Sequence, residues 1–60
     1  MKIKDYFKAM YESTTIIIDD DNSDMELYRG DKKDLPKEFC EKEVIHELGI
    51  MEINKWYFWV

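Results

Sequence analysis

Cys40 and His46 are the only two side chains in the sequence that suit nucleophilic catalysis. Such a pair needs the imidazole within hydrogen-bond reach of the sulfur, and a third group that orients the imidazole. Cys40 falls on the apolar side of a predicted helix, where a buried thiol is usually inert. The chain shows no orienting third residue, and its two glycines are too few for a glycine-rich oxyanion loop. We therefore expect no enzymatic activity and no catalytic residue.

The same two residues are the best candidates for a metal site. A structural zinc site needs four ligands, which are typically cysteine, histidine or carboxylate side chains. Cys40 and His46 with either Glu43 or Glu47 remain one ligand short of that number. A single cysteine also excludes a disulfide within the chain. The sequence therefore predicts neither a metal nor any other cofactor.

A dense acidic segment covers residues 19–26 and raises the question of calcium binding. An EF-hand loop needs glycine at position 6 and glutamate at position 12. Counting from Asp19, these positions hold Asp24 and Gly30, and counting from the next residue fails as well. The simplest interpretation is a solvated turn, and the alternative is an acidic surface that imitates nucleic-acid phosphates for a basic partner. The acidic residues of the segment are Asp19, Asp20, Asp21, Asp24 and Glu26.

Length and composition narrow the class of protein further. Sixty residues form a single domain, residues 1–60, with a thin core. Nine basic against fourteen acidic side chains give a net charge of −5, which argues against direct binding of nucleic acid. The longest apolar run, residues 56–60, is far shorter than the roughly 20 residues that span a bilayer. Residues 1–5 lack the apolar stretch of a signal peptide. We expect a cytoplasmic protein that does not associate with membranes.

The spacing of apolar residues predicts the elements that position these side chains. Helical periodicity predicts a helix over residues 2–11, and Asp34 opens a second, short helix. β-Branched and aromatic residues predict strands at 14–18 and 25–29, and two more strands within 44–60, where 50–53 and 56–60 are richest in strand formers. The order α-β-β-α-β-β predicts a two-layer α+β fold, with a small antiparallel sheet and two short helices on one face. The last turn lies at either Gly49 or Asn54-Lys55.

Alternation along the predicted strands separates two sheet faces. We expect the helices to cover the face that carries Ile16, Ile18, Met25, Leu27, Trp56 and Phe58. The other face keeps large apolar side chains with no helix over them, and such patches mark interaction surfaces. The alternative is that a strongly twisted sheet is partly covered on both faces by loops and termini. The predicted partner-binding residues are Ile17, Tyr28, Tyr57 and Trp59.

The chain combines an amphipathic start, an isoleucine-rich hairpin, a short helix opened by a proline motif and a terminal β segment. The first three are Lys2–Tyr11, Ile16–Asp19 with Glu26–Gly30, and Asp34–Pro36. In this combination the chain resembles a loose group of short proteins encoded by phages and integrated elements of Gram-positive bacteria. Small phage proteins of this kind often bind and block a host protein, including components of antiviral defence. The resemblance implies the same role here and carries over no catalytic or binding residue.

Taken together, these patterns predict a small, acidic, non-enzymatic protein-binding module. The resemblance implies that it is encoded by a phage or mobile element and inhibits a host protein. Three alternatives stay open at this point. The first is a nucleic-acid mimic that places the acidic turn 19–26 in a basic groove. The second is a homodimer through the aromatic face, and the third is an accessory subunit of a larger assembly.

Overall fold

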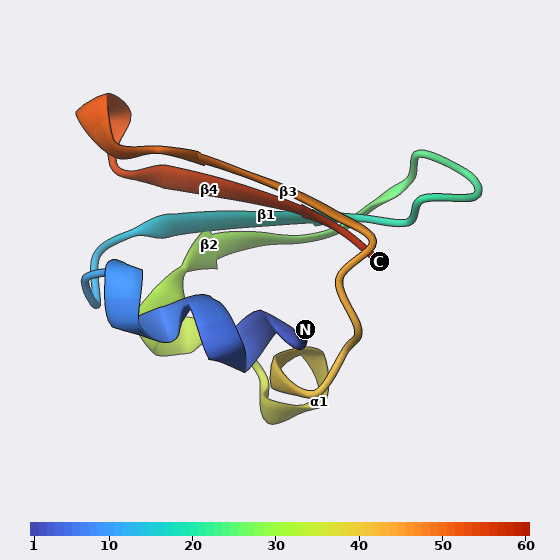
Figure 1. Ribbon diagram of the computed structural model, residues 1–60, viewed down its shortest axis with the longest axis horizontal. Helices are drawn as coiled ribbons and strands as arrows, with labels where there is room; N and C mark the ends of the chain where they lie inside the picture. The colour runs from blue at the N-terminus through green and yellow to red at the C-terminus, as the bar shows by residue number, and fades with distance from the viewer.

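The structure, a computed structural model, describes residues 1–60 as a four-stranded sheet with helical segments on one face (Figure 1). The strands are rich in β-branched and aromatic side chains, which favour pleated, half-buried positions. In chain order, the elements are the 3₁₀ helix η1 (Ile3–Ala9), β1 (Thr15–Asp19), β2 (Glu26–Asp31), the 3₁₀ helix η2 (Lys32–Asp34), α1 (Lys37–Cys40), β3 (His46–Ile50), the 3₁₀ helix η3 (Met51–Ile53) and β4 (Lys55–Trp59).

The strands lie in the spatial order β2-β1-β4-β3, and the sheet is mixed. β1 pairs antiparallel with β2 and parallel with β4, while β3 and β4 form a second antiparallel pair. The chain between the two hairpins contains η2 and α1 and passes along one face of the sheet (Figure 1). It therefore returns the second hairpin beside the first, with β4 parallel to β1. The α+β class is confirmed, and the expectation of a wholly antiparallel sheet is wrong.

The three consecutive isoleucines of β1 are buried from both sides of the sheet. Ile16 and Ile18 are fully buried, and Ile17 is only 3% exposed. Ile16 and Ile18 point into the helical layer. Ile17 points to the other face, where its register neighbours Arg29 and Tyr57 lie on either side of it.

The core lies between the sheet and the helical layer. Its fully buried members are Ile3, Ile16, Ile18 and Phe58. Partly buried side chains complete it, namely Tyr6, Phe7, Met10, Tyr28, Leu35, Phe39, Val44, Trp56 and Val60. The expected contribution of Met25 and Leu27 is wrong, because they are 65% and 44% exposed. The hairpin register sets Tyr28 opposite Ile18, so Tyr28 takes the inward position instead.

The helical segments and the last turn differ in detail from the sequence-based expectation. The first helix is the seven-residue η1, and α1 is a single turn of four residues. Residues 44–60 hold two strands as expected, but the segment 50–53 is not one of them, because Met51–Ile53 form η3 and β3 begins earlier in the chain. Asn54 follows η3 with a left-handed φ of 54°, a conformation that asparagine tolerates. The turn into β4 therefore lies at Asn54, and Gly49 is inside β3. No helix is long and apolar enough to cross a bilayer.

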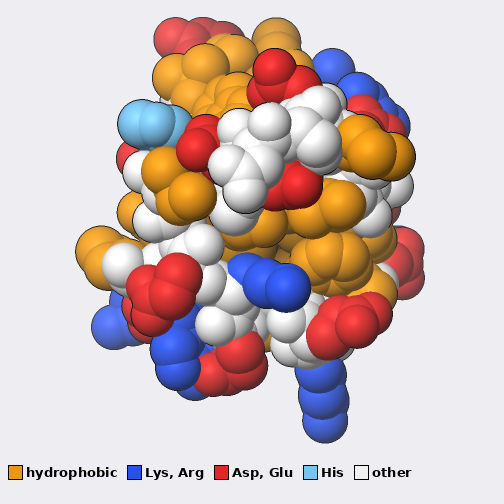
Figure 2. Space-filling model, turned by 90° about the vertical axis from the view of Figure 1, so that its right-hand side faces the viewer, with side chains coloured by type: hydrophobic (Ala, Val, Ile, Leu, Met, Phe, Trp, Pro, Cys, Tyr) orange, Lys and Arg blue, Asp and Glu red, His pale blue; other side chains and the backbone are white.

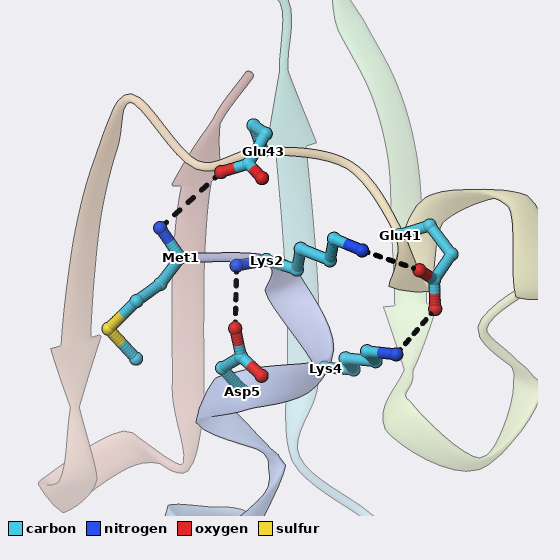
Figure 3. Close-up of polar contacts among 6 residues, drawn as sticks. All are labelled: Met1, Lys2, Lys4, Asp5, Glu41 and Glu43. Carbon is cyan, nitrogen blue, oxygen red and sulfur yellow. Dashed lines mark hydrogen bonds and ion pairs between the residues drawn. The ribbon is translucent and has the colours of Figure 1, made fainter.

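Ion pairs fasten the start of the chain to the segment that follows α1 (Figure 3). The ammonium groups of Lys2 and Lys4 lie 3.0 and 2.8 Å from the two carboxylate oxygens of Glu41. These hydrogen bonds, first that from Lys4 and then that from Lys2, lower the pKa of Glu41. The N-terminal amine lies 3.4 Å from Glu43, and the backbone N–H of Val44 donates to the carbonyl of Met1 at 2.8 Å. η1 is thus held beneath the sheet.

Candidate functional site

One face of the sheet has no helix over it and is hereafter the open face (Figure 1). Residues paired across neighbouring strands share a face. Ile17, which points away from the helical layer, pairs with Arg29 on β2 and Tyr57 on β4. Tyr57 in turn pairs with Leu48 on β3. These side chains form the open face together with the next cross-strand row, which consists of Asp19, Trp59 and His46.

Two aromatic rings lie side by side in the centre of the open face. Tyr57 and Trp59 alternate with the inward residues of β4, and their rings stack with centroids 6.3 Å apart and planes 20° apart. Both side chains remain partly exposed. Leu48 beside them is 51% exposed. The structure therefore brings together two of the four predicted partner-binding residues on one accessible surface.

Ile17 lies on the open face but beneath its surface. It is 3% exposed, although no helix covers it. Its neighbours in register are Arg29 and Tyr57, whose long side chains lie on either side of it. Ile17 therefore serves as the floor of the open face and does not present a contact surface of its own.

Tyr28 was predicted on the open face, and this placement is wrong. It lies opposite Ile18 and packs into the core, with its ring 5.7 Å from that of Phe39. Its hydroxyl donates a hydrogen bond of 3.1 Å to the carbonyl of Asp31. Burial, followed by the negative charges of Asp34 and Asp31, raises the pKa of Tyr28. The register between β1 and β2 decides which side of β2 is buried. The six residues that connect the two strands do not determine this register from the sequence alone.

The acidic segment forms an ordered turn at the end of the first hairpin. One carboxylate oxygen of Asp20 accepts from the backbone N–H of Asn22 at 3.2 Å, and the other accepts from the hydroxyl of Ser23 at 2.9 Å. The backbone N–H of Asp24, which has a φ of 58°, donates to the carbonyl of Asp20 at 2.8 Å. Aspartate side chains commonly hold turns in this way. The turn is also fastened to the sheet, because the N–H of Asp21 donates to the carbonyl of Val60 at 2.9 Å.

The charges of this segment are largely uncompensated. Glu26 is the exception, because the Arg29 guanidinium lies 2.8 Å from its carboxylate and lowers the pKa of that carboxyl. The other four carboxylates form no ion pair with any lysine or arginine of the chain, and they belong to Asp19, Asp20, Asp21 and Asp24. No three acidic, histidine or cysteine side chains gather closely enough to hold a metal ion.

A shallow hollow lies where the acidic turn meets the open face. It has a volume of about 260 Å³ and is lined by Asp21, Asp24, His46 and Trp59. Figure 2 views this end of the molecule and shows acidic, hydrophobic and histidine side chains next to one another. The hollow joins the two surfaces that the sequence predicted as separate candidates, the aromatic face and the acidic turn.

The structure does not bring the two candidate nucleophilic residues together. Cys40 lies in α1, in the layer that covers the inner face, and its sulfur is 3.8 Å from the carbonyl oxygen of Pro36. His46 is exposed and lines the hollow on the open face. The sheet therefore separates the thiol from the imidazole.

Sequence reasoning missed the contribution of β3 to this surface. Leu48 and His46 reach the open face because β3 covers residues 46–50, whereas the sequence had the strongest strand formers at 50–53 and assigned neither residue to a face. The alternation of Leu48 and Ile50 with Glu47 and Gly49 is the signal that could have located this strand. No protein-family model, curated protein or solved structure matches this chain.

Proposed function

We propose that the protein is a small protein-binding module that docks onto a partner protein through the open face. The observation that carries the proposal is the stacked, partly exposed pair of Tyr57 and Trp59 on a sheet face with no helix over it. A chain of this size has a thin core, and the two rings would stabilise the fold more if they were buried in that core than they do on the open face. Tyrosine and tryptophan are enriched at the energetic centres of protein interfaces.

The composition of the open face resembles that of a protein interface. Leu48 and the two rings form an apolar centre, while the ion pair of Glu26 with Arg29 lies at one edge. Apolar centres with polar rims are the common arrangement in protein–protein interfaces. A standard interface takes about 800 Å² per partner, roughly a fifth of the 4069 Å² surface of this chain.

Docking is proposed in place of catalysis because the two candidate nucleophilic residues are not assembled into one site. Cys40 and His46 lie on opposite sides of the sheet. We propose further that the module is encoded by a phage or mobile element, acts in the cytoplasm of its host, and inhibits the host protein that it binds. The support for this part is the resemblance of its hairpin, short helix and terminal β segment to small phage proteins.

Affinity capture with a matched pair of variants tests the proposal. Leu48→Ser removes an apolar side chain that is 51% exposed on the open face, and Tyr11→Ser removes one that is 68% exposed in the loop between η1 and β1. We expect a partner captured by wild type and by Tyr11→Ser to be lost with Leu48→Ser. Equal capture by all three proteins contradicts docking through the open face. Sedimentation of wild type across a concentration range identifies the case in which the partner is a second copy.

A second candidate function is mimicry of nucleic acid by the acidic turn. It is favoured by the four carboxylates that have no ion-pair partner within the chain. Binding of a basic groove to this turn should weaken steeply as salt is added, because exposed charges are screened. Replacing the four aspartates together by asparagine should abolish it, while Leu48→Ser should leave it unchanged. Salt-insensitive binding contradicts this alternative. The four residues are Asp19, Asp20, Asp21 and Asp24.

A further inference from the structure

We infer that the hollow between the acidic turn and the open face receives an arginine side chain of the partner protein. This inference rests on the proposed function and names the chemistry of one partner contact. Its geometric basis is the set of four residues, Asp21, Asp24, His46 and Trp59, that line a hollow of about 260 Å³.

The hollow carries negative charge that the chain itself does not neutralise. The side chains of Asp21 and Asp24 form no ion pair, and they take part in none of the side-chain hydrogen bonds that hold the turn. Arg29, on the other edge of the sheet, is engaged by Glu26 through two hydrogen bonds of 2.8 and 3.1 Å. Both carboxylates are therefore free to pair with a cation of another molecule, and charge complementarity points to a basic partner group.

The backbone that bears these carboxylates is held in place before a partner binds. The backbone of Asp21 is hydrogen-bonded to the end of β4, and Asp20 organises the turn with its own side chain. A preformed acceptor loses less conformational entropy on binding. The residues that bear the free carboxylates are thus fixed near the Trp59 ring.

The aromatic wall of the hollow selects among cations. Trp59 is held by its stack on Tyr57, with the ring centroids 6.3 Å apart. A guanidinium stacks on an indole face and simultaneously donates several hydrogen bonds in its plane, whereas an ammonium is a compact point charge. A metal ion fits poorly, because no three potential ligands gather closely enough to hold one. The combination of one ring and two carboxylates matches a guanidinium.

Titration of the isotope-labelled protein with short capped peptides tests the inference without the partner. The three probes are acetyl-Gly-Arg-Gly-amide and the same peptide with citrulline or lysine in place of arginine. We expect the arginine peptide to shift the Trp59 indole N–H and His46 ring signals in a saturable manner, and citrulline to bind at least about tenfold more weakly. The indole N–H of Trp56, which is buried on the covered side, should not move and serves as the internal reference.

Matched variants separate the hollow from general acidity. Asp21→Asn with Asp24→Asn should weaken arginine-peptide binding about tenfold or more, and asparagine accepts the left-handed backbone at position 24. Asp34→Asn with Glu52→Gln removes the same charge elsewhere on the surface and should leave binding unchanged. Binding of citrulline as tightly as arginine, unchanged binding by the first double variant, or no saturable shift at Trp59 overturns the inference. Equal binding of the lysine peptide overturns the assignment to guanidinium.

The outcome is distinguishable from that of the proposed function. If the peptide titration fails but partner capture is still lost with Leu48→Ser, the arginine contact is rejected. The proposal of docking through the open face then still stands. Equal partner capture by wild type and Leu48→Ser removes the docking proposal, whatever the peptide titration shows.

Discussion

The hydroxyl of Thr14 donates a 2.6 Å hydrogen bond to the side-chain oxygen of Asn54, forty residues further along the chain. Thr14 is 2% exposed and also accepts from the backbone N–H of Tyr11 at 2.9 Å. The carbonyl of Asn54 accepts from the N–H of Thr15 at 3.0 Å. These bonds join the loop before β1 to the turn before β4, at the start of the parallel pair. They fix the contact that unites the two hairpins.

Removal of this hydroxyl should destabilise the whole sheet. Thr14→Val keeps the shape of the side chain and leaves the donor of Tyr11 and the acceptor of Asn54 without a partner. We expect the free energy of unfolding in urea to fall by about 1–3 kcal/mol. Thr14→Ser retains the hydroxyl and loses one methyl group, which costs about 0.8 kcal/mol. A valine variant as stable as wild type would show that the bonds contribute nothing to stability.

A methyl group at Gly49 should disturb the packing of β3 against β4. An added Cβ would lie 2.8 to 2.9 Å from three carbon atoms of the Trp56 indole, which packs against the core. Because such overpacking typically costs about 1–3 kcal/mol, Gly49→Ala should lower the unfolding free energy by that amount. At Gly30 an added Cβ would have a single atom closer than 3.0 Å, the Tyr28 hydroxyl oxygen at 2.7 Å, so Gly30→Ala should cost less. Thermal unfolding of both variants checks the order, and the reverse order contradicts the placement of Trp56.

The ion pairs of Glu41 should make stability depend on pH in the acid range. Lys4 and Lys2 lower its pKa in the folded state, so the pairs stabilise the fold above the ordinary carboxyl pKa. This contribution is lost as the pH falls through the lowered pKa of the folded state. Glu41→Gln should therefore lower the melting temperature at neutral pH, and the difference from wild type should vanish in acid and shrink with added salt. Glu52→Gln, an exposed carboxylate without an ion pair, is the control. A difference that persists in acid means that Glu41 acts through packing.

The sequence was sufficient to predict the layers of the fold but not the register of its strands. The isoleucine run and the aromatic ending identified β1 and β4, since both are composed of strong strand formers. The inward side of β2 depends on pairing across a turn, and Tyr28 rather than Leu27 faces the core for that reason. Register is a property of two strands together, and period-two alternation within one strand cannot determine it.

The candidate site was predicted to a similar extent. Tyr57 and Trp59 could be assigned to one face, because residues two apart on a strand share a face. Leu48 and His46 were not assigned to a face, because the sequence left the last turn open between Gly49 and Asn54-Lys55 and so left the bounds of this strand open too. The hollow beside Trp59 could not be inferred either, since it depends on how the acidic turn folds back onto the end of β4.

Site-specific photocrosslinking to the partner recovered by affinity capture tests most directly whether the open face is the docking surface. A photoreactive benzoylphenylalanine replaces Leu48 in one protein and Tyr11 in another, both exposed by more than half of their surface. The partner should be crosslinked from position 48 and not from position 11. No crosslink from position 48, or a partner crosslinked only from position 11, would contradict the account.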